Sequence, residues 1–297
     1  MNLELYKTFY FVAKFGNISK ASEHLFVTQP AVSRSIKQLE DSLDCLLFFR
    51  TSKGVLMTQE GKVLFQYVEQ AYNFISSGEQ KISDFKTLKT GEIRIGASDT
   101  LCKYYLLPYL KLFKSYYPEI KVSATCPTSP EIIRLLKAGE IDFGIVNMPL
   151  KDDQLSFKHI MKIQDCFVVG QKYKNLSGSK RHISEIVKYP MLLLEKNSNT
   201  RTYIDEYFKG NSISIIPDFE FPNIDLLIHF AKYDLGIACV IENFIEDVLN
   251  KSPLYKINLI EDIPSRSMSV AWLKDIPLTS AAKELIKCLE YEEPYEF

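Results

Sequence analysis

One short stretch of the chain carries small polar and basic side chains at helical spacing. Gln29, Ser33 and Lys37 recur every four residues, and Arg34 lies beside them. Glutamine and arginine can each form paired hydrogen bonds with base edges in a major groove, while hydroxyl and amino groups can bond phosphates. No carboxylate precedes Glu40 on this helix. These residue types at this spacing could therefore bind double-stranded DNA.

Two short helices joined by a tight turn must position those side chains, and residues 18–43 match this arrangement. Ser19 is placed to cap the first helix and Thr28 the second, and Pro30 falls in the first turn of the second. Apolar residues recur at helical spacing in both helices: Ala21, Leu25 and Phe26 in the first, and Val32, Ile36, Leu39 and Leu43 in the second. The alternative is an ordinary pair of amphipathic helices in an all-α domain, where a polar outer face is the default.

The flanking sequence favours DNA binding. Residues 3–15 predict an opening helix that ends at Gly16, and residues 46–57 predict a hairpin that lies beside the second helix as a wing. We expect base edges to be read by Gln29, Ser33, Arg34 and Lys37. Pro30, in the first turn of the same helix, is part of the same candidate DNA-binding site. We expect phosphate contacts from Ser19, Lys20, Thr28, Arg50, Ser52 and Lys53.

A long helix is predicted to follow, from Thr58 to about residue 88. Its apolar residues alternate at spacings of about four and three: Leu64, Val68, Ala71, Ile75, Ile82 and Phe85. Such a helix would be about 45 Å long and would overhang a small domain. Pairing with a second copy is therefore the better explanation, and packing on its own domain is the alternative.

Composition sets broad limits on the class of protein. The 297 residues suffice for about two domains, and an apolar content of 46% is ordinary for a globular chain. The net charge is −1, and the first 62 residues carry eight basic against six acidic side chains. Any affinity for DNA must therefore come from a local patch, to which Lys20, Arg34, Lys37, Arg50 and Lys53 could contribute.

Other features argue against several functions. No apolar run approaches the roughly 20 residues that span a bilayer, and the first residues do not resemble a signal peptide. We therefore expect a cytoplasmic protein without a membrane partner. The six cysteines are scattered, without C-x-x-C spacing, and do not group with the four histidines. Buried free thiols are expected, with no metal site and no cofactor.

After a linker at 89–91 the pattern changes to alternating strands and helices. Strands are predicted at 93–96, 120–126 and 142–146, with helices at 103–117 and 130–138 between them. A second alternation follows from about residue 184 and includes a strand at 213–220 and a helix at 242–249. This indicates two α/β subdomains, with crossovers near residues 161 and 267. Such a pair would enclose a cleft.

Taken together, the motifs along the chain resemble one family, the LysR-type transcriptional regulators. The densest match is Ala21-x-x-x-Leu25-x-Val27-Thr28-Gln29-Pro30-Ala31-Val32-Ser33, followed by Ile36-x-x-Leu39-Glu40-x-x-Leu43, Leu47-Phe48-x-Arg50 and Thr58-x-x-Gly61. Later matches are looser, such as Leu136-x-x-Gly139-x-x-Asp142-x-Gly144-Ile145 and Leu235-Gly236-Ile237-Ala238. The chain departs from the family where Asp44 and Asp234 replace a usual Gly, and where Ile241 replaces a common Pro.

The resemblance implies an α+β multidomain fold. A winged helix-turn-helix would occupy residues 1–60 and a linker helix that dimerises residues 58–89. A bilobal α/β domain similar to periplasmic binding proteins would occupy residues 92–297, with lobe I at 92–161 and 268–297 and lobe II at 162–267. It also implies a transcriptional regulator that binds promoter DNA as a homodimer or homotetramer and responds to a small-molecule co-inducer in the cleft, without enzymatic activity.

The effector site is expected where strands end and helices begin around the cleft. The candidate residues are Ser98, Thr100, Thr128, Ser129, Thr200 and Arg201. By the family pattern, Ser98, Thr100, Thr128 and Thr200 would line the pocket. Hydroxyls and free N–H groups at helix starts favour a small anion such as a carboxylate, although Asp99 would oppose it if it pointed inward. Simple helix capping is the alternative.

The sequence gives less support to three other functions. An enzyme is disfavoured because the sequence shows no nucleophile–His–acid set, no phosphate-binding glycine loop and no metal cluster. A bilobal small-ligand-binding protein would not need the DNA-reading sequence before the cleft, and a ligand-independent regulator would fill its cleft with side chains. A redox-sensing subgroup of the family carries a reactive cysteine where this chain has Asn199 and Thr200, so a peroxide sensor is not expected.

Overall fold

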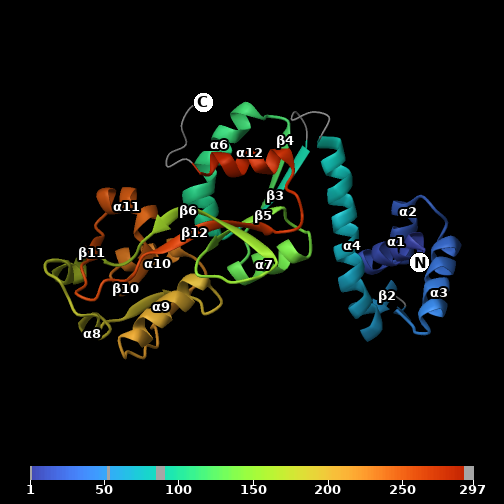
Figure 1. Cartoon of the computed structure of the whole chain (residues 1–297). Helices are drawn as coiled ribbons and strands as arrows, with labels where there is room; N and C mark the ends of the chain where they lie inside the picture. The colour runs from blue at the N-terminus through green and yellow to red at the C-terminus, as the bar shows by residue number, and fades with distance from the viewer. Residues whose placement is uncertain (1, 52–53, 85–90, 291–297) are drawn as a thin grey trace. The chain divides into compact units, whose positions relative to one another are not determined.

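The computed structural model describes residues 2–51, 54–84 and 91–290 (Figure 1). These residues divide into an N-terminal unit, which ends at Ile82, and a C-terminal unit, which holds most of the remainder. Each unit has its own core and is described separately. None of the helices in the described ranges has both the length and the hydropathy that crossing a membrane requires.

The N-terminal unit has the predicted winged helix-turn-helix. Its elements are α1 (Leu3–Phe15), α2 (Ile18–Leu25), α3 (Gln29–Leu43), β1 (Phe48–Thr51), β2 (Gly54–Met57) and α4 (Gln59–Asp84). Strands β1 and β2 pair antiparallel as the wing. The core joins one face of each helix, with Phe9, Val12, Ala21, Val32 and Leu39 almost fully buried. The periodic apolar residues form helices here because their buried faces close on one another.

Some local predictions in this unit are wrong. Asn17, rather than Ser19, caps α2, because its side-chain oxygen accepts the backbone N–H groups of Ser19 and Lys20. Thr28 holds the N-cap position of α3, but its side chain makes no capping hydrogen bond. Phe26, which ends α2 in the left-handed region, is 95% exposed, and Leu43 is also exposed.

The wing is fixed to the helices by hydrogen bonds from both ends. The Glu40 carboxylate accepts the backbone N–H groups of Leu47 at 2.8 Å and Phe48 at 3.3 Å. Thr58 caps α4 by accepting the N–H of Gly61, as predicted, and its hydroxyl also donates to the Leu46 carbonyl. Gly61 lies so close to the wing that an added Cβ would meet a backbone oxygen at 2.2 Å.

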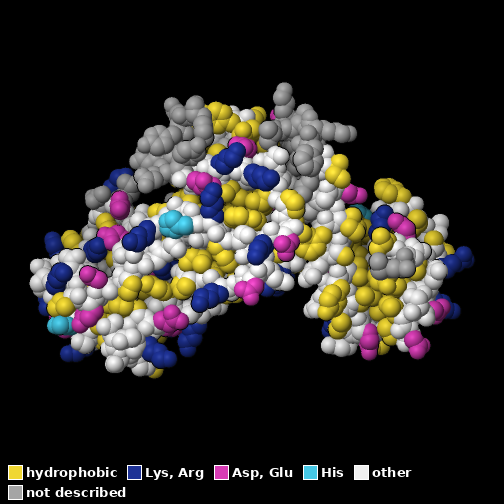
Figure 2. Space-filling view, in the orientation of Figure 1, with side chains coloured by type: hydrophobic (Ala, Val, Ile, Leu, Met, Phe, Trp, Pro, Cys, Tyr) yellow, Lys and Arg dark blue, Asp and Glu magenta, His cyan; other side chains and the backbone are white. Residues whose placement is uncertain are grey.

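The apolar residues along α4 divide into a buried group and an exposed group. Leu64 and Val68 pack in the core of the N-terminal unit, so packing on the unit's own core accounts for this part. The exposed apolar stripe instead holds Val63, Tyr67, Ile75 and Ile82, with exposed fractions of 51–69%. Figure 2 shows exposed hydrophobic side chains on this unit. Phe85 and the end of the predicted helix lie outside the described residues.

The C-terminal unit consists of two lobes, each built on a five-stranded sheet. Lobe I contains β3 (Gly91–Ala97), α5 (Asp99–Leu101), the π-helical segment η1 (Cys102–Leu106), α6 (Leu107–Tyr116), β4 (Ile120–Thr125), α7 (Ser129–Lys137), β5 (Phe143–Asn147), β6 (Leu155–Ile163), β12 (Arg266–Leu273) and α12 (Ser280–Cys288). Its strand order is β4-β3-β5-β12-β6, with β3 parallel to β4 and β5, and β12 antiparallel to its neighbours.

Lobe II lies between β6 and β12 in the sequence. It contains β7 (Asp165–Val169), η2 (Gln171–Ser177), α8 (Ile183–Ile186), β8 (Met191–Leu194), α9 (Asn199–Gly210), β9 (Phe219–Phe221), α10 (Ile224–Lys232), β10 (Ile237–Ile241), η3 (Glu242–Phe244), α11 (Glu246–Lys251) and β11 (Tyr255–Ile257). Its strand order is β11-β7-β10-β8-β9, with β8 parallel to β9 and β10 and β7 antiparallel to its neighbours.

Helices cover both faces of each sheet. In lobe I, Ile145 packs with α6 and α12, whereas the next residue, Val146, packs with α7. In lobe II, Phe167 packs with α9, whereas Val168 packs with α10. Burial on both faces explains why these strands are continuous apolar runs rather than alternating ones. The core that contains Ile145 and Val168 is continuous between the lobes.

Several element boundaries differ from the predictions. The strand expected at 213–220 is reduced to β9, because the chain before it makes no ladder. The helix expected at 103–117 begins at Asp99 and passes through a π-helical turn, and the helix expected at 242–249 is split into η3 and α11. The strands change sheet at Gln164 and between Ile257 and Arg266.

Candidate functional site

The polar face of α3 is open in the N-terminal unit. Gln29, Arg34 and Lys37 are exposed, and Ser33 is half-buried beside them. Within the described ranges, no side chain or backbone group bonds the Arg34 guanidinium or the Lys37 amine. Glu40 points to the wing backbone instead of this face. The helix therefore presents unpaired donors without a nearby internal carboxylate partner.

The residues predicted to contact phosphates lie on α2, at the start of α3 and on the wing. Lys20, Thr28 and Arg50 are exposed, and Ser19 is half-buried. Pro30, in the first turn of α3, is also exposed. Ser52 and Lys53 lie outside the described residues. The roles of all these residues in DNA binding stay predictions.

Asp44 ends α3 in a backbone conformation that favours glycine. Its φ is 53° and its ψ is 37°, and its N–H bonds the Glu40 carbonyl as a helix cap. A residue with a Cβ adopts this conformation at a cost of about 1 kcal/mol. The departure from the usual Gly therefore leaves the end of the helix in place at the expense of local strain. Asp234 occupies the same region, with φ 60°.

A cavity of about 290 Å³ lies in the C-terminal unit between the two lobes. Five of the six predicted effector residues line it: Ser98, Thr100, Thr128, Ser129 and Thr200. They meet because β3, β4 and β8 all end at the cavity and the following helices begin there. The binding roles of these residues stay predictions.

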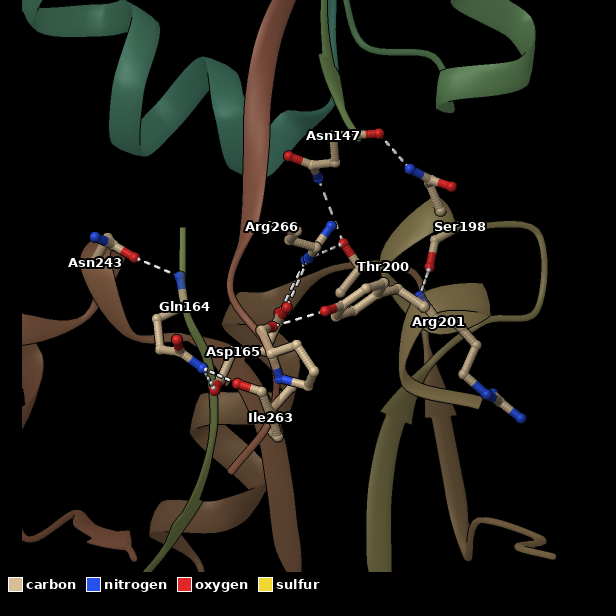
Figure 3. Close-up of polar contacts among 12 residues, drawn as sticks. Asn147, Gln164, Asp165, Ser198, Thr200, Arg201, Asn243, Ile263 and Arg266 are labelled. Carbon is tan, nitrogen blue, oxygen red and sulfur yellow. Dashed lines mark hydrogen bonds and ion pairs between the residues drawn. The ribbon is translucent and has the colours of Figure 1, made fainter. Parts of the chain in front are cut away.

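Arg201 does not line the cavity, so the structure gives no support to its predicted place in the effector pocket. Its side chain is 2% exposed and pairs with Asp205 at 2.8 Å and with Glu220, while it also donates to the Leu194 carbonyl. Figure 3 shows this guanidinium pointing away from the residues at the cavity. Arg201 therefore fixes α9 to the sheet of lobe II.

Asn147 was missed by the sequence analysis and lies at the floor of the cavity. It ends β5, and its Nδ2 donates to Thr200 Oγ1 at 3.4 Å, while its carbonyl accepts the Asn199 side-chain amide (Figure 3). Its Oδ1 is buried without a hydrogen-bond partner in the described chain. An unsatisfied buried acceptor is costly, and its burial keeps it out of reach of a molecule in the cavity unless the side chain turns. A polar residue directly after the apolar run of β5 was the available signal.

The two strand crossovers are joined by a buried ion pair that the sequence analysis also missed. Arg266 Nε donates to Asp165 Oδ2 at 2.6 Å, and Nη2 donates to Oδ1 at 2.9 Å (Figure 3). Arg266 also donates to Thr200 Oγ1 at 3.1 Å. The pair thus connects the hinge between the lobes to the cavity wall. Sequence offered no clear signal, since 101 positions separate the partners.

The charges at the cavity do not favour the expected anion. The charged residues that line it are Asp99 and Glu195. Asp99 Oδ1 accepts the Thr100 N–H, and Glu131 accepts both the N–H and the hydroxyl of Thr128, which lowers the pKa of Glu131. Two helix starts are therefore already occupied by the chain's own carboxylates, where an anion would otherwise bind.

One polar contact closes the lobes beside the cavity. The Lys103 amine and the Tyr104 hydroxyl of lobe I both donate to Asp225 Oδ1 of α10, at 2.7 and 2.5 Å. Burial raises the pKa of Asp225, but these two donors outweigh burial and lower it. We call these three residues the lobe contact. It is part of the arrangement that a ligand would have to stabilise or open.

Both units match family models. Residues 3–62 match the bacterial regulatory helix-turn-helix protein of the lysR family, and residues 86–293 match the LysR substrate binding domain. The second match covers more than half of the chain, and the chain therefore belongs to the LysR family. This confirms the family that the sequence motifs resemble, and the α+β multidomain fold class.

Curated relatives are similar over most of their length. The transcriptional regulator YofA of Bacillus velezensis is 24% identical over 286 residues, which is 96% of each chain. The uncharacterised regulator YvbU of Bacillus subtilis is 25% identical over 279 residues, covering 94% of this chain and 91% of the relative. The regulator cbl of Escherichia coli is 29% identical over 230 residues, covering 76% and 72%.

Solved structures share the fold. Full-length CbnR in complex with its target DNA gives a TM-score of 0.68 at 17% identity and covers 97% of this chain and 99% of CbnR. A full-length OxyR variant from Pseudomonas aeruginosa gives 0.73 at 18% identity, covering 97% and 94%. At these identities the similarity concerns the fold alone.

Proposed function

We propose that this protein is a DNA-binding transcriptional regulator that reads promoter DNA with α3 and responds to a small molecule in the cavity between its lobes. The observation that carries the DNA-binding role is the open polar face of α3, on which Arg34 and Lys37 have no partner among the described residues. A helix of this kind fits the major groove, and the wing and α2 supply donors for phosphates. Since the chromosome is its target, we expect the protein in the cytoplasm.

The C-terminal unit gives less support for contacts with DNA. On the face in Figure 2, Lys, Arg, Asp and Glu side chains are interspersed over this unit without a large patch of one sign. Such a surface concentrates little potential for a polyanion. We therefore propose that the N-terminal unit recognises the operator.

Arg34→Ala tests the reading of bases. We expect it to weaken binding to the operator by about tenfold or more, because a bidentate contact to a base is worth about 1–3 kcal/mol, and to weaken binding to unrelated DNA much less. Fluorescence anisotropy with both DNAs at one salt concentration measures this, and Lys7→Ala on α1 is the control for losing one exposed positive charge. Equal losses on both DNAs would leave Arg34 only a phosphate role.

We also propose that α4 pairs two copies, so that the protein binds DNA as a homodimer or homotetramer. The supporting observation is the exposed stripe of Val63, Tyr67, Ile75 and Ile82 on a helix of 26 residues, about 39 Å long. Sedimentation of Ile75→Glu should show smaller species than wild type at equal concentration. An unchanged sedimentation profile would rule out this stripe as the interface.

For the ligand, the cavity favours a small molecule that donates hydrogen bonds, and a positively charged amine matches it best. The supporting observation is that the charged residues among the described cavity lining, Asp99 and Glu195, are both negative. The cavity is open rather than filled by side chains, which disfavours the ligand-independent alternative. The carboxylate anion that the helix starts suggested is the competing outcome.

Four linear probes of equal carbon number distinguish these ligands: 1,4-diaminobutane, 4-aminobutanoate, erythritol and succinate. Thermal shifts followed by calorimetry should rank the amines above erythritol, and erythritol above succinate. Glu195→Gln should reduce the response to the amines, whereas Lys121→Met, on the exposed side of β4, should not. A response to succinate alone would restore the anion.

A further inference from the structure

Two cysteines that are far apart in sequence meet at the rim of the cavity. The sulfur atoms of Cys102 and Cys126 lie 3.7 Å apart. The parallel pairing of β3 with β4 aligns Gly96 with Thr125, so Cys126 follows at the end of the pair. The helix that starts at Asp99 then brings Cys102 back toward the end of β3, where its thiol donates to the Ala97 carbonyl at 3.5 Å. The expectation of scattered, buried thiols is therefore wrong for this pair.

The two thiols differ in access. Cys126 is exposed and lines the cavity, and Cys102 is half-buried behind it. Burial, together with the neighbouring Cys126 and Asp99, raises the pKa of Cys102 to about 12, so this thiol stays protonated at neutral pH. Of the other cysteines, Cys239 also lines the cavity but is only 4% exposed, Cys166 and Cys288 are buried, and Cys45 lies in the N-terminal unit. Cys126 is thus the thiol that a small oxidant reaches from the cavity.

We propose that Cys102 and Cys126 form a reversible dithiol–disulfide site that a hydroperoxide oxidises. In the first step the Cys126 sulfur attacks the outer oxygen of the hydroperoxide, the O–O bond breaks, and an alcohol or water leaves, so that Cys126 becomes a sulfenic acid. In the second step the Cys102 sulfur attacks the Cys126 sulfur, the S–O bond breaks, and the hydroxyl leaves as water with the Cys102 proton. A thiol reductant returns both cysteines to thiols.

The geometry allows this bond with little movement. The sulfurs must approach from 3.7 Å to about 2.0 Å, a change within the reach of side-chain rotations when one partner is exposed. Both cysteines lie at the junctions where strands end and helices begin, and η1 is an irregular turn rather than a regular helix. Sequence neighbours of Cys102 take part in the lobe contact, since Lys103 and Tyr104 bond Asp225.

The bond would therefore act on two parts of the regulatory site. It removes the Cys126 thiol from the cavity lining, and it pulls on the turn that holds the lobe contact. The effect on transcription rests on the proposed function, whereas the thiol chemistry does not. The site is distinct from Asn199 and Thr200, where the redox-sensing subgroup carries its cysteine.

Counting thiols in the full-length protein tests the chemistry. After treatment with hydrogen peroxide, N-ethylmaleimide under denaturing conditions should label four cysteines instead of six, and peptide mapping by mass spectrometry should find Cys102 linked to Cys126 within one chain. Dithiothreitol should restore six. Cys102→Ser should instead leave a sulfenic acid on Cys126 that dimedone traps, and Cys126→Ser should keep five thiols. Cys45→Ser is the control and should still form the bond.

The results separate the site from the proposed function. Six labelled cysteines in oxidised wild type, or a bond that joins two chains or other cysteines, would overturn the site. If the bond forms, oxidised and reduced protein should differ at least threefold in operator affinity or in the response to 1,4-diaminobutane, and Cys102→Ser/Cys126→Ser should lose that difference. A disulfide without either difference would refute the coupling. Failure of the reduced protein to bind any promoter DNA would refute only the proposed function.

Discussion

Removing the charge of Asp165 is the change for which the structure makes the sharpest prediction. Its carboxylate is fully buried and accepts two hydrogen bonds from Arg266, whose side chain is 2% exposed. Asp165→Asn keeps the volume and one acceptor but leaves the guanidinium buried without a counter-ion. The third guanidinium nitrogen of Arg266, Nη1, is also buried and has no hydrogen-bond partner among the described residues.

The expected loss of stability follows from that burial. Breaking a buried ion pair by removing one partner typically costs about 3–5 kcal/mol, and the retained amide oxygen places Asp165→Asn near the lower end. For a unit of this size, about 3 kcal/mol corresponds to a fall of about 6–12 °C in the unfolding midpoint. Arg266→Met in the Asp165→Asn background removes the uncompensated charge and should recover part of the loss.

The chain contains a convenient probe for this measurement. Its single tryptophan, Trp272, lies on β12 in lobe I, so tryptophan fluorescence reports on the C-terminal unit. Glu92→Gln is the matched control, because Glu92 pairs with the largely exposed Lys121 in the same sheet as Trp272. An exposed pair of this kind contributes about 0–1 kcal/mol.

The comparison can refute the reasoning directly. If Asp165→Asn lowers the midpoint no more than Glu92→Gln does, the buried pair is not a structural link at the hinge. If the free energy of unfolding lost in the double variant equals the sum of the losses in Asp165→Asn and in Arg266→Met, the charge left behind is not the cause of the loss.

Three further predictions concern glycine positions and pH. Gly61→Ala should lower the stability of the N-terminal unit and weaken operator binding, because its Cβ would meet a wing carbonyl at 2.2 Å. The Cβ of Gly78→Ala, on the same helix, meets nothing within 4 Å among the described residues. Gly78→Ala should therefore stabilise the N-terminal unit by about 0.5–1 kcal/mol in circular-dichroism melts. Asp44→Gly should raise the stability in urea titrations by about 1 kcal/mol, since it relieves a φ of 53°, and a loss would show that the Asp side chain contributes more than the strain. The hydrogen bond between His182 and Glu261 raises the pKa of the histidine above 6.5 and lowers that of the glutamate below 4.5. The histidine's contribution to stability is lost as the pH rises through its raised pKa, and the glutamate's contribution is lost as the pH falls through its lowered pKa. His182→Gln should therefore lower the unfolding midpoint more at pH 5.5 than at pH 8. Equal falls at both pH values would contradict a stabilising pair.

Much of the N-terminal unit could be predicted because its signals are local. Helical periodicity, the N-cap at Thr58 and the Gly16 stop are each encoded within a few residues. The errors concern groups whose environment depends on the fold: Asn17 displaced Ser19 as the cap, and Leu64 and Val68 turned inward while Val63 and Tyr67 stayed exposed. A heptad-like spacing cannot distinguish a core face from an interface, because both are apolar at the same period.

The cavity likewise has some residues that local sequence signals predicted and others whose role depends on the fold. Sequence located five of the cavity-lining residues, because strand ends in an α/β sheet are recognisable and lie at one edge. It misjudged Arg201, since a basic residue at a helix start reads as a ligand group until Asp205 and Glu220 are seen beside it. The charge of the lining likewise depends on which neighbours turn inward.

The sequence by itself determined the family, the order of the two units and the polar helix face that is proposed to read DNA, since these depend on residues close together in the chain. Only the tertiary structure decided the buried Asp165–Arg266 pair, the partnerless Asn147 Oδ1 and the approach of Cys102 to Cys126. Each of these joins segments on separate strands or lobes, so strand register and packing, rather than local spacing, set which side chains meet.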